Sequence, residues 1–219
     1  MLRFPAVGIL RASNVSFSEA AFVLLMLATV SFDGISSTAL AAGVINFFLD
    51  NGFGIMLAKS LLLFGVFAFF VSLYLLFILL VQIYARSELR LISLAKHFVL
   101  SLLPIAIVYE VAHFTTLLIT EGQRILILIS DPFGYGWNIF GTAFSTVNYG
   151  VINFKFLWNA EVGLILLGHV VSIYIAHMVA LSVFDNASTA RRSQIPMLIL
   201  MVGYTVLGLW ILAQPPVLV

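Results

Sequence analysis

The strongest constraint on this chain is a series of long apolar runs, each long enough to cross a lipid bilayer. A transmembrane helix needs about 20 mostly apolar residues in succession. The run 55–84 exceeds that length with Lys59 as its one charged residue. Of 219 residues, 63% are hydrophobic and 9% are charged, whereas roughly a quarter of the residues in a soluble domain are charged. The sequence therefore predicts a multi-pass membrane protein.

Five spans are expected within one polytopic membrane domain, residues 1–219. They cover approximately residues 17–32, 55–84, 97–120, 158–184 and 196–213, which predicts an all-α bundle. Ser16 and Glu19 fit a capping box at the start of the first span. Pro104 predicts a kink in the third span, and Pro196 is expected to open the fifth.

Two connections carry more structure than a simple loop would. The segment 35–54 is small, apolar and interrupted by glycines, and is expected to lie along or dip into the membrane surface. The connection 121–159 contains the turn-rich aromatic stretch 131–138 and Trp158, whose ring suits a membrane interface. We expect an ordered, partly re-entrant outer cap with one or two short segments.

The distribution of basic residues predicts the orientation of the spans. Seven of them fall on one side of the predicted topology and three on the other, and the richer side is normally cytoplasmic. The richer side holds Arg3, Arg11, Arg86, Arg90, Lys96, Arg191 and Arg192, against Lys59, Arg124 and Lys155. We therefore expect a cytoplasmic N-terminus and an external C-terminus. Residues 1–16 lack an apolar segment typical of a removable signal peptide.

Composition and motifs disfavour several functions. The formal net charge of +1 provides no basic surface for a nucleic-acid backbone, so nucleic acid is not an expected partner. The chain has no cysteine, which removes thiolate catalysis and cysteine-bound metal. Neither nucleophile-elbow nor phosphate-loop motifs occur. An odd span number without a clear internal repeat argues against a carrier with inverted halves.

The third span contains two ionisable residues, Glu110 and His113, within an otherwise apolar run. Ionisable side chains at membrane depth are costly and usually mark functional sites. Glu110 and His169 of the fourth span are each expected at roughly 16 Å from the outer ends of their helices. A carboxylate and two imidazoles can bind Zn, Fe, Mn or Cu. We expect Glu110, His113 and His169 to converge as metal ligands.

Two alternatives to a metal remain open at these residues: a functional polar or proton site, and a purely structural hydrogen-bond network. Further polar residues are expected to edge an outward pocket beneath the cap, namely Asp33, Glu121, Gln123, Asp131 and Glu161. Haem is disfavoured as a cofactor, because His97 and His177 offer no second histidine pair at a matching depth.

Several motifs together resemble a family of bacterial integral membrane proteins often labelled fenitrothion hydrolase. The resemblance rests on residues 30–34, 110–113 with 121–123, 130–138 with 140–142, and 193–197. Members of that family are usually longer, so this chain is similar to their C-terminal part. The resemblance implies a bacterial inner-membrane location. It also implies hydrolysis by a metal-activated water, which adds weight to the three expected ligands.

Three classes of function are therefore considered from the sequence. The first is a membrane-embedded metal-dependent enzyme, hydrolytic or oxidative. The second is a subunit of a larger membrane complex, since the chain has no soluble domain. The third is a component of a proton- or cation-coupled transporter. The sequence favours a combination of the first two, with the site between the third and fourth spans.

Overall fold

The computed structural model describes residues 15–151 and 153–213, and every regular element within them is a helix. Five stretches are long and apolar enough to cross a membrane. They are α1 (Phe17–Ser36), α3 (Ile55–Ala85), the continuous run of α4 (Leu91–Val99), η2 (Leu100–Leu102) and α5 (Leu103–Glu121), then α7 (Phe154–Val183) and α8 (Ala187–Leu212). The shorter helices are α2 (Ala39–Asp50), α6 (Gln123–Ser130) and η3 (Tyr149–Val151). The predicted all-α bundle of five spans is confirmed.

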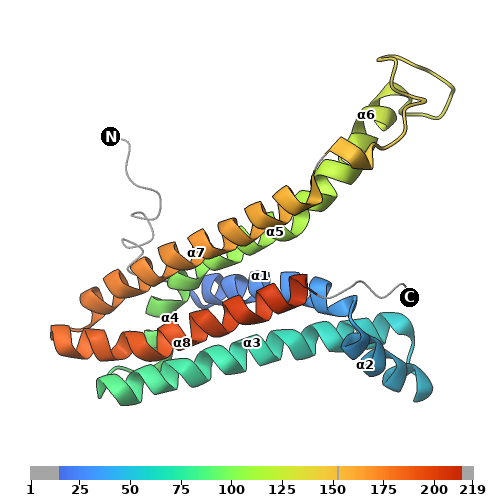
Figure 1. Ribbon diagram of the computed structural model, residues 1–219. Coiled ribbons are helices and arrows are strands. Elements are labelled where there is room, and N and C mark those ends of the chain that lie inside the picture. Colours follow the sequence, from blue (N-terminus) through green and yellow to red (C-terminus); the bar gives the residue numbers. More distant parts are fainter. Residues whose placement is uncertain (1–14, 152, 214–219) are drawn as a thin grey trace, which may run out of the picture.

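The spans alternate in direction, as a multi-pass topology requires (Figure 1). Helices α1, α5 and α8 run from the left of the view to the right, and α3 and α7 return. The connections 86–90 and 184–186 consequently lie together at the left, which we call the basic end because Arg86, Arg90, Arg191 and Arg192 are there. Helix α2 and the segment 122–151 lie at the opposite end, called the arm end.

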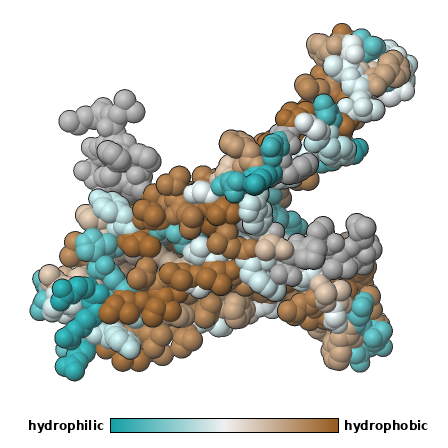
Figure 2. Space-filling model, in the orientation of Figure 1, coloured by the Kyte–Doolittle hydropathy of each residue, from teal (hydrophilic) through white to brown (hydrophobic). Residues whose placement is uncertain are grey.

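The flank of the bundle is covered by apolar side chains (Figure 2). Phe64 and Phe69 of α3 and Leu167 of α7 are more than half exposed. Hydrophilic residues gather at the basic end, whereas the segment that projects from the arm end shows hydrophobic and hydrophilic residues together. In water such a surface would be unfavourable, whereas in lipid it satisfies the hydrophobic requirement. The lipid bilayer is therefore the environment that this surface fits.

The main core lies towards the basic end, where α3 packs against α4 and α8. Phe70 stacks on Tyr204 with ring centroids 5.1 Å apart, and both side chains are buried. The buried Tyr74 hydroxyl donates to the Ala95 carbonyl over 2.6 Å. This bond joins α3 to α4 and satisfies a polar atom that lipid could not.

The first span begins where the sequence predicts and ends later. The capping box is present, because the Ser16 side chain accepts from the Glu19 amide at 3.1 Å and Glu19 Oε2 accepts from the Ser16 amide at 2.7 Å. Helix α1 continues past residue 32 to Ser36. Gly34 therefore lies inside the helix, where its lack of a side chain admits Ile211 of α8, which a Cβ there would meet at 2.2 Å.

The two prolines act differently from each other. Pro104 stands at the start of α5, directly after the 3-10 turn of η2, so the helix type changes where the sequence predicts a kink. That span also begins earlier than predicted, at Leu91. Pro196 lies inside α8 and does not open it. The Asn186 side chain caps the helix by accepting from the Ser188 amide at 2.9 Å, so the segment 187–195 is helical and not a turn.

Two further helix contacts depend on glycine. A Cβ on Gly168 of α7 would lie 2.2 Å from the Val108 side chain of α5, and one on Gly208 of α8 would lie 2.2 Å from the Tyr109 ring. Gly163 and Gly203, five residues earlier in the same helices, have no such neighbour within 4 Å. Close packing therefore occurs at one glycine of each pair.

Alanine substitution should separate the packed glycines from the unpacked ones. Gly168→Ala and Gly208→Ala are expected to cost about 1–3 kcal/mol, because Val108 or Tyr109 must shift to make room. Gly163→Ala and Gly203→Ala should be neutral or slightly stabilising, since alanine favours a helix interior. Thermal unfolding of the four variants in one detergent measures the difference. Equal melting temperatures within each pair would contradict these helix contacts.

Candidate functional site

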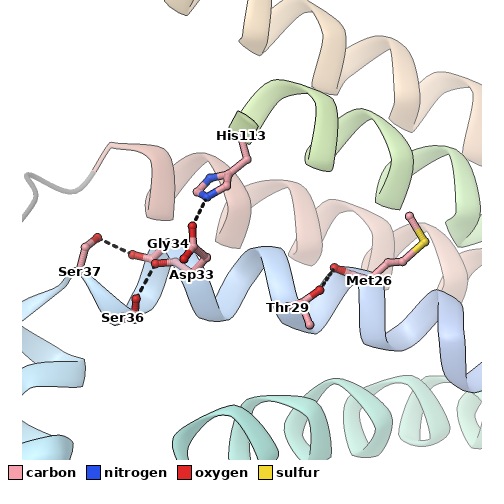
Figure 3. A network of polar contacts seen from close by, with 7 residues as sticks. All are labelled: Met26, Thr29, Asp33, Gly34, Ser36, Ser37 and His113. Atoms are coloured by element: carbon pink, nitrogen blue, oxygen red, sulfur yellow. Dashed lines mark hydrogen bonds and ion pairs between the residues drawn. The ribbon is translucent and has the colours of Figure 1, made fainter. Parts of the chain in front are cut away.

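The third span meets the first through a carboxylate and an imidazole (Figure 3). Nε2 of His113 on α5 lies 2.7 Å from Oδ2 of Asp33 on α1. The His113 side chain is 18% exposed and that of Asp33 is 58% exposed. The His113 side chain is thus mostly enclosed by the bundle, whereas the Asp33 side chain is accessible from outside it.

Local structure at the end of α1 holds Asp33 in place. The Ser36 hydroxyl donates to the Asp33 carbonyl and the Ser37 hydroxyl donates to the Gly34 carbonyl, each over 2.8 Å (Figure 3). These bonds satisfy carbonyls that have no partner at a helix end. The His113 ring meets the Phe114 ring edge-on at 4.9 Å. Both ionisable side chains are therefore positioned by their own helices.

Glu110 lies one turn from His113 on the same face of α5. It is partly buried and interacts electrostatically with both His113 and Asp33. We call Asp33, Glu110 and His113 the outer polar cluster. Two carboxylates and one imidazole can hold a proton between them, because the imidazole carries it where the carboxylates stabilise the charge.

A second polar contact joins α5 to α7 nearer the arm end. The Thr116 hydroxyl donates to Oε1 of Glu161 over 3.1 Å, and Glu161 is 8% exposed. Glu161 was predicted to edge a pocket. The structure places it in a buried interhelical contact, where a carboxylate requires a donor.

His169 does not join Glu110 and His113. Its Nδ1 lies 2.8 Å from the Ile165 carbonyl one turn earlier in α7, and the main chain of Met201 on α8 faces the ring. The described part of the chain contains no group of three or more His, Asp or Glu side chains that could hold a metal ion. The predicted convergence of Glu110, His113 and His169 is therefore corrected: His113 takes Asp33 as its partner.

The remaining predicted pocket residues have structural roles in the projecting connection. Glu121 pairs with Arg124 across the start of α6. Gln123 donates to the Asn148 carbonyl at 3.1 Å and accepts from the Asn148 amide at 2.9 Å. Asp131 accepts from the amides of residues 135 and 136, both at 2.9 Å. None of these bonds involves the outer polar cluster.

The segment 122–151, called the arm, projects from the bundle near the ends of α5 and α7 (Figures 1 and 2). The sequence predicts that it covers the outward pocket. The structure corrects this expectation, because α6 nearly continues the direction of α5 and carries the aromatic stretch away from Asp33. The outer polar cluster thus lies at the base of the arm with no lid formed by residues 131–138.

The other two histidines are paired near the basic end. Nδ1 of His97 lies 2.7 Å from the Ser93 carbonyl, and Nδ1 of His177 lies 2.9 Å from Oε1 of Gln194 on α8. Each therefore has a separate partner, and haem ligation gains no support.

Sequence reasoning missed three polar residues that the bundle buries or pairs: Tyr109, Thr116 and Ser172. A signal for two of them exists in the spacing. Ser172 lies three residues after His169 and Thr116 three residues after His113, and residues three apart share a helix face. Tyr109 gives no such signal, because tyrosine is common on apolar helix faces.

The chain was compared with protein-family models, with curated proteins and with solved structures, and nothing among them matches it. The resemblance to the fenitrothion hydrolase family stays a prediction.

Removal of the Thr116 hydroxyl should destabilise the α5–α7 contact. Thr116→Val keeps the shape of the side chain and leaves the buried Glu161 oxygen without its donor, which is expected to cost about 1–2 kcal/mol. Thr115→Val is the matched control, because the Thr115 hydroxyl donates to the Val111 carbonyl of its own helix. Thermal unfolding in detergent compares the two, and equal loss in both would show that the Glu161 contact contributes nothing specific.

Proposed function

We propose that this multi-pass membrane protein binds and releases protons at the outer polar cluster, as a component of a proton-coupled membrane system. The observation that supports this proposal is the 2.7 Å contact between His113 and Asp33. It joins two titratable side chains from different spans, with Glu110 beside them on α5. Ionisable residues that pair within a membrane bundle are typical of proton relays.

The exposures in the cluster suggest a direction for proton entry. The Asp33 side chain is 58% exposed and His113 is 18% exposed, so a proton from solvent at the arm end reaches Asp33 first. His113 can pass a proton between the two carboxylates, because an imidazole can accept a proton at one ring nitrogen and release one from the other. Glu110 lies one helical turn further into the span and is the next acceptor.

A metal-dependent enzyme receives less support than a proton site. A catalytic zinc or iron centre usually has three protein ligands, and the described residues contain no such group. Hydrolysis of a phosphotriester, which the family resemblance implies, would use a metal-activated water. That reading therefore rests on the resemblance alone.

The proposal extends to orientation and location. Arg86, Arg90, Arg191 and Arg192 lie at one end of the bundle, and the positive-inside rule favours the cytoplasm for that end. Asp33 would then face the outside. For a bacterial chain, this means an inner-membrane protein whose outer polar cluster takes protons from the periplasmic side.

A second candidate function is that of a subunit in a larger membrane complex, which the arm favours. Its stretch 130–143 is tied internally: the Ser130 carbonyl accepts from the Ile139 amide at 3.1 Å and its hydroxyl accepts from the Phe140 amide at 3.1 Å. Even so, the arm exposes Phe133 by 68%, Tyr135 by 74% and Phe144 by 81%. Ordered, exposed aromatic side chains are typical of protein interfaces.

Neutralising Glu110 should impair proton movement through the protein. In liposomes with an internal pH-sensitive dye and an imposed potential, Glu110→Gln and Asp33→Asn are each expected to lower proton flux by about tenfold or more, because each removes a proton-accepting group. Glu88→Gln, in the connection at the basic end, is the control and should leave flux unchanged. Flux in the unsubstituted protein no greater than in empty liposomes, or flux unaffected by Glu110→Gln, would overturn the proposal.

The subunit reading predicts a discrete neighbour at the arm. A photo-crosslinking amino acid at Tyr135, activated in native membranes, is expected to give an adduct of one defined mass. The same amino acid at Phe64, which is 68% exposed on the flank of α3, should give only lipid adducts. If both positions yield the same pattern, the arm has no specific protein neighbour and the subunit role loses its support.

A further inference from the structure

A groove between α7 and α8 begins at the basic end of the bundle and combines a charged side chain with an apolar surface. Its volume is about 230 Å³, so it leaves room beside the two helices for a further group of atoms. Arg191 and Gln194 of α8 line what we call its polar mouth. The other lining residues are apolar and include Ile173 and Ala176 of α7 and Leu198 and Met201 of α8.

The groove runs from the basic end into the membrane-spanning part of the bundle. Arg191, Gln194, Leu198 and Met201 follow one another at intervals of three or four residues, so they share one face of α8. Helix α8 starts at the basic end (Figure 1), and Met201 lies roughly 15 Å further along it than Arg191. The hydrocarbon core of a bilayer is about 30 Å thick. The groove is therefore about as long as one leaflet is deep.

The apolar part of the groove opens towards the surrounding lipid. Ala176 and Met201 are buried and form its floor. Side chains at its edges are between 40% and 50% exposed, namely Ile173, Ile195 and Leu198. Half-exposed apolar edges at membrane depth are solvated by hydrocarbon, so a lipid chain can enter the groove from the side.

The polar mouth offers hydrogen-bond donors. Oε1 of Gln194 accepts from Nδ1 of His177 at 2.9 Å, and Nε2 of Gln194 donates to the Ala190 carbonyl at 3.1 Å, which leaves one N–H of that amide. Arg191 is exposed and forms no ion pair with any residue that the structure describes. Its guanidinium provides five donors and no acceptor. No acidic residue lines the groove, so the mouth favours an anion.

We propose that this groove binds an anionic phospholipid from the leaflet at the basic end. The lipid phosphate accepts hydrogen bonds from the Arg191 guanidinium and the Gln194 amide, and one acyl chain lies along the apolar floor towards Met201. Paired donors of arginine match the geometry of a phosphate, and basic pockets between membrane helices typically bind anionic headgroups. The site lies at the opposite end of the bundle from Asp33 and does not depend on the proposed proton function.

Native mass spectrometry of the full chain, released from detergent micelles, tests the proposal. Phosphatidylglycerol and phosphatidylcholine with identical acyl chains are added separately, and the lipid-bound fraction is measured. We expect phosphatidylglycerol to bind at least about fivefold more tightly, and Arg191→Gln to abolish that preference. Arg192→Gln is the matched control, because it removes the same charge from the next residue, which does not line the groove. It should change the preference by less than about twofold.

Three results would overturn the proposal. Equal binding of the two lipids by the unsubstituted protein would show that the groove does not select an anionic headgroup. Equal loss of preference in Arg191→Gln and Arg192→Gln would assign it to the general charge of the basic end. Displacement of phosphatidylglycerol by an equal concentration of glycerol 3-phosphate would show a site for soluble phosphate. The first and third comparisons use the unsubstituted protein, so they stand even if a variant fails to fold.

Discussion

The structure depends on one constraint: a polar group within the bilayer must find its partner inside the protein. Pairs between helices meet that requirement in this bundle. Tyr74 reaches the Ala95 carbonyl, Thr116 reaches Glu161, and His113 reaches Asp33. Each bond also fixes the position of one span relative to another, so the satisfied polar groups and the helix arrangement are not independent features.

Close approach between helices makes these pairings possible. Gly168 and Gly208 bring α7 and α8 against the successive residues Val108 and Tyr109 of α5, which sets the depth of every polar side chain on that helix. Glu110 and His113 then face the end of α1, and His169 is enclosed by α7 and α8. The hydrogen-bond partner of each of these histidines therefore depends on which neighbouring helix its side chain contacts.

Much of the fold could be predicted, because each span must be long and apolar whatever the other spans do. The capping box at Ser16 is a local feature and is confirmed, and a 3-10 turn lies where Pro104 predicts a kink. The first span continues past the predicted residue 32 to Ser36, and Pro196 lies inside α8 because the Asn186 side chain caps that helix ten residues earlier. For the site, the sequence allows the depth of each polar residue in the membrane to be estimated. It does not give the rotation of each helix about its axis, which decides the neighbour that a side chain faces.

The sequence by itself determined that this chain inserts in a membrane, that it crosses five times, and that α5 carries an exceptional pair in Glu110 and His113. These properties follow from hydropathy, length and charge, which each segment possesses independently. Only the tertiary structure decided that His113 pairs with Asp33, that His169 turns towards α8, and that the arm projects instead of covering the site. Those outcomes depend on helix rotation and close contact, which arise when the spans pack together.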